Sequence, residues 1–196
     1  MTATRGILAG AAAGAAGTTA LNLITYLDMT LRGRGASSTP EDTVEKLSDA
    51  AHVTVPGEGD TRDNRLSALG ALTGIASGIG IGAALGLARG LGWRPGPVVS
   101  GTAATLGALV GTNVPMTVLG VTDPRTWPLD SWVSDIVPHL GYGAVTAAVL
   151  KASTRELADP QPVDDTESHL PTRGSPACRS CSSSPPFPAG ATPAGH

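Results

Sequence analysis

The sequence predicts an all-α membrane protein with four transmembrane helices, and three observations lead to that class. Long uncharged stretches recur along the chain, glycine repeats at every fourth position in one of them, and polar residues gather between and after them. An uncharged helix of about 20 residues crosses a hydrocarbon core of about 30 Å. We therefore expect a transmembrane domain over residues 1–156 and a disordered Ser/Pro-rich tail over residues 157–196.

The four expected spans are helices of about residues 6–28, 66–90, 97–120 and 130–151. The first is expected to be a retained helix, because its uncharged run of 22 residues is longer than the apolar region of a signal peptide. The third contains prolines but no charge. The fourth has only 15 uncharged residues, so its assignment depends on Trp127 and Trp132 before it and Lys151 after it. Such residues are typical of a membrane interface.

Glycines recur at every fourth position of the second span: Gly70, Gly74, Gly78, Gly82, Gly86 and Gly90. In water each would cost about 1 kcal/mol relative to alanine in a helix, whereas in a membrane small residues let two backbones approach closely. The first span carries a similar series at Gly6, Gly10 and Gly14. A row of glycines spaced by four residues drifts around the surface of a helix that has 3.6 residues per turn. A helix that packs along this row must therefore cross at an angle, or two different neighbours must each contact part of the row. We expect packing inside the bundle, with a homo-oligomer through this glycine zipper as the alternative.

A short amphipathic helix is expected in the first loop, over residues 40–52. It begins in residues 38–42 with a hydroxyl cap, a proline in the first position and two acids in the first turn. Val44, Leu47 and Ala51 then recur on one face. We expect this helix to lie on the membrane surface or to cap the bundle.

Polar residues of the spans are expected at one level, because the ends of the four helices meet there in an up-down bundle. They form a candidate polar cluster of Asp28, Asn113, Asp135, His139 and Tyr142. The last three share a helix face, and Pro138 among them removes a backbone donor and favours a kink. A histidine beside an aspartate in a partly dry place can pass or sense protons. The other interpretation is that these groups only form hydrogen bonds between helices.

Charge and motifs argue against several classes of function. The formal net charge is −3 and no basic tract occurs, so nucleic acid is not an expected partner. Motifs for a nucleophile, a zinc site, a phosphate loop or a dinucleotide fold do not occur, so we expect no catalytic residue, metal or cofactor, and no enzyme. The role of Cys178 and Cys181 in the tail is not determined. Basic residues divide almost evenly between the two sides, five against six, which leaves the membrane orientation undetermined.

One further pattern occurs within residues 113–143. Its features are Pro115-Met116 before Leu119-Gly120, Thr122 with Pro124, Trp132, Ser134, and His139-Leu140 followed by an aromatic residue at 142. This stretch resembles the C-terminal part of the YagU family of small bacterial inner-membrane proteins. The resemblance implies a polytopic protein without an established biochemical activity, and a link to acid tolerance.

We therefore expect a multi-pass protein of the bacterial cytoplasmic membrane, surrounded by lipid, with a structural or stress-related role that includes acid stress. One alternative is a proton- or ion-conducting or transporting unit, assembled through the glycine zipper. Another is a membrane enzyme that uses His139 and an aspartate. Several copies would be needed to enclose a conduction path, whereas an enzyme would need a polar, substrate-sized pocket around His139.

Overall fold

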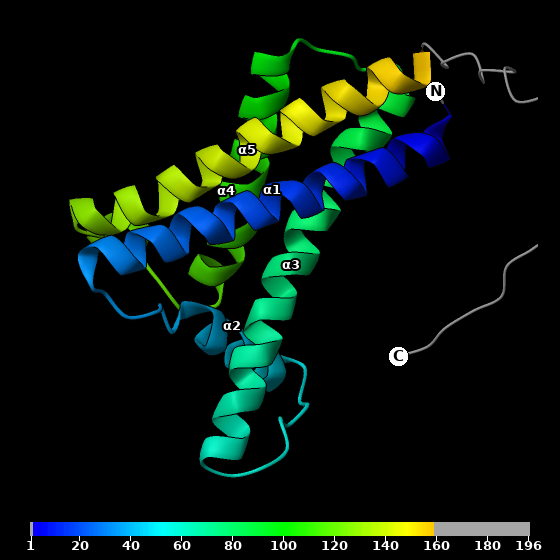
Figure 1. Ribbon diagram of the computed structural model, residues 1–196. Coiled ribbons are helices and arrows are strands. Elements are labelled where there is room, and N and C mark those ends of the chain that lie inside the picture. Colours follow the sequence, from blue (N-terminus) through cyan, green and yellow to red (C-terminus); the bar gives the residue numbers. More distant parts are fainter. Residues whose placement is uncertain (1, 159–196) are drawn as a thin grey trace, which may run out of the picture. The chain divides into compact units, whose positions relative to one another are not determined.

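The computed structural model describes residues 2–158, with side chains as far as Ser153, and every element in this range is helical. The elements are α1 (Ala3–Arg32), α2 (Thr39–Ala50), α3 (Asp60–Gly90), α4 (Pro97–Val118), the 3-10 helix η1 (Pro124–Thr126) and α5 (Leu129–Ala158) (Figure 1). The all-α prediction is confirmed for this part of the chain. The first two residues of the expected disordered tail, 157 and 158, belong to α5, and the rest of it, residues 159–196 with Cys178 and Cys181, lies outside the described residues.

Three helices are long and apolar enough to cross a membrane: α1, α3 and residues 129–153 of α5. The helix α4 is not among them, although it has 22 residues and no charge. Its apolar residues are interrupted by serine, threonine, asparagine, glycine and two prolines. The spans predicted for α1, α3 and α5 thus have matching helices, while the prediction of four spans is met only in part.

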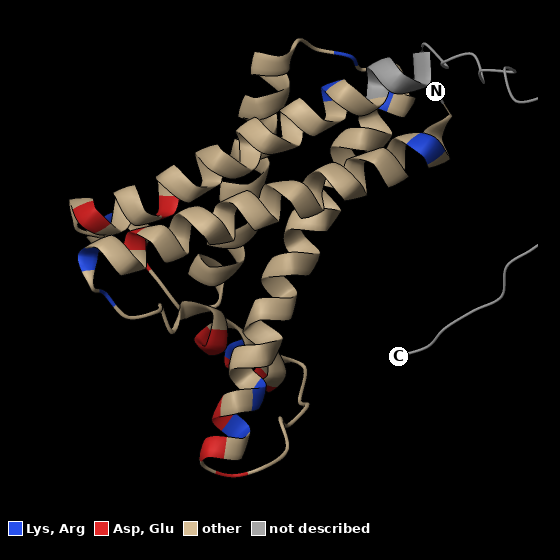
Figure 2. Ribbon diagram, viewed as in Figure 1, with Lys and Arg blue, Asp and Glu red and all other residues tan. Residues whose placement is uncertain are grey.

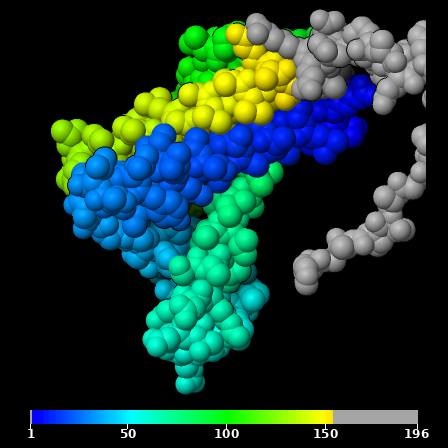
Figure 3. Space-filling model, viewed as in Figure 1, coloured from blue at the N-terminus to red at the C-terminus, as the bar shows by residue number. Residues whose placement is uncertain are grey.

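The helix α1 packs against both α3 and α5, and α5 also packs against α4. In Figures 1 and 3, α1 and α5 lie side by side over much of their length, and α3 crosses α1 at a steep angle. The N-terminal part of α3 leaves this contact and packs against α2. Glycine ends α1, because Gly33 takes up the left-handed conformation (φ 63°) that this helix end requires.

The helix α2 begins one residue earlier and ends two residues earlier than predicted, and its apolar face rests on α3. Val44 is buried there, while Leu47 is exposed. An ion pair of 2.7 Å joins the carboxylate of Glu45 to Arg62 at the start of α3. The predicted hydroxyl cap is wrong: the Ser38 hydroxyl donates to the carboxylate of Asp42 at 3.1 Å and caps no backbone N–H.

Small residues fill the helix contacts, and large apolar side chains point outward. The buried residues include Ala13, Ala104 and Ala108 together with many glycines. In contrast, Leu31 is 84% exposed and Val118 is 81% exposed. Large apolar side chains on the sides of the helices, such as Leu8 at 66% and Leu72 at 59%, are exposed as well. This distribution indicates that the outer surface of the helices is suited to an apolar solvent.

Candidate functional site

The closest helix contact lies where the glycines of α1 meet those of α3. A Cβ placed on Gly82 would lie 2.5 Å from the Cα of Gly14, and one on Gly86 would lie 2.7 Å from the Cα of Gly10. Ordinary contacts of a Cβ begin at 3.4 Å. The two backbones therefore touch directly, and no residue larger than glycine fits at these positions without separating the helices.

The glycine series of α3 serves two different neighbours and leaves one member unused. Gly78, Gly82, Gly86 and Gly90 face α1, whereas Gly70 faces Pro40 at the start of α2. A Cβ on Gly74 would meet nothing within 4 Å. Of the six glycines predicted to mediate packing, five lie against another element and Gly74 does not.

Tyr142 lies at the point where the helices converge. Tyr142 is 1% exposed, and its hydroxyl donates to the backbone carbonyl of Gly78 on α3 at 2.7 Å. Ala104 and Ala108 of α4 belong to the same buried cluster. Gly17 of α1 leaves room for the Tyr142 ring, because a Cβ on Gly17 would lie only 2.8 Å from the Cδ2 atom of that ring. Tyr142 thus connects α1, α3, α4 and α5, and its hydroxyl is not directed to the polar groups with which the sequence grouped it.

Three members of the candidate polar cluster come together between α4 and α5. The side-chain amide of Asn113 donates to the carboxylate of Asp135 at 2.9 Å. The Nδ1 atom of His139 lies 2.7 Å from the backbone carbonyl oxygen of Asp135 and 3.4 Å from its carboxylate. A carbonyl oxygen only accepts hydrogen bonds, so Nδ1 is the donor in this contact. His139 is 8% exposed, which makes this a nearly dry helix contact.

Asp28 belongs to a neighbouring ionic group rather than to the Asn113 group. Its carboxylate accepts from Arg32 at 2.7 Å and from Arg34 at 2.6 Å. Arg32 also donates to the hydroxyl of Ser134, the residue before Asp135. The end of α1 is therefore tied to the start of α5, next to the Asn113–Asp135–His139 group.

The opposite end of these helices is basic, and it contains a buried arginine that the sequence did not single out. Arg89 is 7% exposed and donates to the hydroxyl of Ser100 at 2.7 Å, which ties the end of α3 to the start of α4. In Figure 2 the described ribbon at this end carries blue residues and no red ones. The basic side chains that flank the spans here are Arg5, Arg89, Arg94 and Lys151. Sequence position alone marked Arg89 as a flanking charge and did not show its burial.

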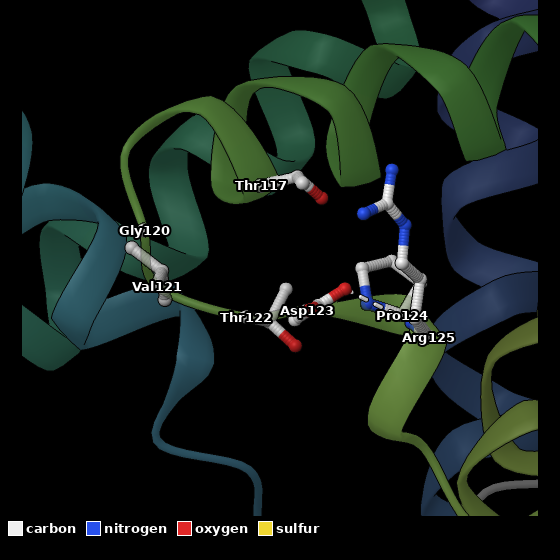
Figure 4. Close-up of a pocket in the computed structure, with 7 residues that line it drawn as sticks. All are labelled: Thr117, Gly120, Val121, Thr122, Asp123, Pro124 and Arg125. Carbon is white, nitrogen blue, oxygen red and sulfur yellow. Dashed lines mark hydrogen bonds between the residues drawn. The ribbon is translucent and has the colours of Figure 1, made fainter.

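The described surface includes two hollows that lie in different parts of the fold. The first, of about 500 Å³, lies in the loop after α4, where Thr117, Asp123 and Arg125 surround it (Figure 4). Asp123 caps the backbone N–H of Arg125 at 3.0 Å, which keeps this loop in shape. The second, of about 700 Å³, is an apolar groove between α4 and α5 that has Lys151 in its lining. Neither of these two hollows is lined by His139.

Within residues 2–158, no group of three or more histidine, cysteine, aspartate or glutamate residues is arranged to hold a metal ion. Comparisons with protein-family models, curated proteins and solved structures give no match for this chain. The class of the protein is therefore inferred from the length of its helices and from the distribution of apolar and small residues on them. Three helices of spanning length, with apolar residues outward and small residues inward, indicate a multi-pass membrane protein.

Proposed function

We propose that the protein is a structural component of the bacterial cytoplasmic membrane that acts in envelope stress, with α1, α3, α4 and α5 all crossing the bilayer. The observation that carries this proposal is the packing of the helices around Tyr142, which brings α1, α3, α4 and α5 together at one buried contact. The similarity of residues 113–143 to the YagU family supports a stress-related role, including acid stress.

The span by α4 is the part of the proposal that needs a direct test. Arg94 lies in the loop before α4 and Arg125 lies in η1 after it, and both are exposed. In a chain with Cys178 and Cys181 replaced by serine, single cysteines at these two positions should react with an impermeant thiol reagent from opposite sides of the membrane. Labelling of both from the same side would show that α4 does not cross.

The role is tested by deleting the gene in its host and measuring survival at acid pH and the permeability of the envelope. Loss of survival, restored by the wild-type gene, supports a stress function. A deletion strain that is indistinguishable from its parent under acid and osmotic challenge would contradict it.

The second candidate function is proton handling by Asp135 and His139, and the pairing of their side chains at 3.4 Å favours it. Proteoliposomes with a trapped pH-sensitive dye separate the two functions. A structural component leaves the decay of an imposed pH gradient as slow as in empty liposomes. A proton-conducting unit accelerates that decay, and His139→Ala removes the acceleration. The membrane-enzyme alternative gains less support, because His139 lines neither of the two hollows described above.

A further inference from the structure

The groove between α4 and α5 is apolar and elongated, as a binding site for a hydrocarbon chain must be. Its more buried lining consists of small side chains, Thr105 and Ala147, while Val98, Leu106 and Leu140 stand exposed along it. On α5 the lining runs from Ile136 to Lys151, which corresponds to about 22 Å of helix. One leaflet of the hydrocarbon core is about 15 Å thick, so the groove is long enough to follow an acyl chain through a whole leaflet.

Positive charge gathers at the end of this groove where α4 begins, whereas near its other end Arg32 and Arg34 are paired with the carboxylate of Asp28. Lys151 is the first charged residue of α5 after Asp135, and it lines the groove together with Pro97 in the first turn of α4. Arg94 lies three residues before Pro97, and the buried Arg89 is bound to Ser100 in the first helical turns of α4. No side chain caps the N-terminus of α4, so its free N–H groups add to the positive potential.

We propose that this groove binds an anionic phospholipid, with one acyl chain between α4 and α5 and the phosphate at Lys151 and the start of α4. A lysine at the end of a span extends its ammonium group to the headgroup level, where lipid phosphates lie. Apolar lining along the chain and positive charge at one end match the two halves of such a lipid. The inference rests on the proposed insertion in a bilayer and adds a specific lipid partner to it.

The experiment compares dioleoyl phosphatidylglycerol with dioleoyl phosphatidylcholine, which have the same acyl chains and differ in net headgroup charge. Lipid retained by the purified full-length protein is counted by native mass spectrometry during a titration. The anionic lipid should bind about fivefold more tightly, as expected for one basic residue near an anionic headgroup. Lys151→Gln should remove this preference, and Lys46→Gln, an exposed lysine on α2, should keep it.

The chain-binding part is tested by filling the groove. Ala148 is exposed and lines it, so Ala148→Phe should lower the binding of both lipids, whereas Ala12→Phe on the exposed surface of α1 should not. An unchanged unfolding temperature verifies that each variant is folded. Equal binding of the two lipids by the wild type, or wild-type binding by Lys151→Gln or Ala148→Phe, would overturn the proposal. Failure of membrane insertion is seen separately, because the protein then remains in the alkaline carbonate supernatant whatever lipid is added.

Discussion

The contact between α1 and α3 predicts that the same substitution destabilises the fold at one glycine of the stripe and has almost no effect at another. In Gly82→Leu the new Cβ would lie 2.5 Å from the Cα of Gly14 and would also strike the carbonyl oxygen of Gly10. Backbone atoms cannot rotate away as a side chain can, so the two helices must separate by about 1 Å to reach an ordinary contact. Adding methylene groups to a packed site costs about 1–3 kcal/mol, and leucine adds four carbons, so we expect a loss of about 3 kcal/mol.

Gly74→Leu is the matched control, because it lies two steps earlier in the same series and has nothing within 4 Å of its Cβ position. We expect the free energy of unfolding of Gly74→Leu to differ from the wild-type value by no more than about 0.5 kcal/mol. The better helix propensity of leucine acts in the stabilising direction. Reversible unfolding in mixed micelles with increasing dodecyl sulfate, followed by circular dichroism, gives the free energy of unfolding of both variants. Equal unfolding midpoints for Gly82→Leu and Gly74→Leu would show that the α1–α3 contact does not support the fold.

Three further predictions concern other parts of the molecule. Tyr142→Phe removes the hydrogen bond to the Gly78 carbonyl and should lower the free energy of unfolding by about 1 kcal/mol; an unchanged value in the same micelle assay would contradict the assigned bond. His139→Ala should cost about 1 kcal/mol or less and leave proton leakage of proteoliposomes unchanged, and a slower leak than wild type would instead favour the proton-handling function. Truncation after Ala158 should leave insertion and unfolding midpoint unchanged, because the contacts described above lie within the retained residues; loss of the protein from the membrane fraction would refute this.

The helices themselves could be predicted from the sequence. An uncharged run has a length that can be compared with a bilayer, and charges or prolines near its ends limit it. For this reason the bounds of the four predicted helices agree with those of α1, α3, α4 and α5 to within several residues, although α4 is not among the helices long and apolar enough to cross a membrane. The glycine period also indicated a close backbone approach, since a helix with so many glycines gains stability only from a partner.

The partner of that stripe was decided by the tertiary structure. The sequence showed one glycine series in each of two helices, but only their crossing brings Gly10 and Gly14 against Gly82 and Gly86 and leaves Gly74 open. A period of four drifts around the helix, so the stripe faces more than one direction, and which part of it is used depends on where the second helix crosses.

Helical spacing likewise determined that Asp135, His139 and Tyr142 share a face of α5, but not how deep each side chain lies. His139 bonds within its own helix near α4, while the longer Tyr142 side chain reaches the carbonyl of Gly78. The burial of Arg89 beside Ser100 depends in the same way on contacts between separate helices. Periodicity assigns a residue to a face from local geometry alone, whereas its depth and its partner depend on segments far away in the chain.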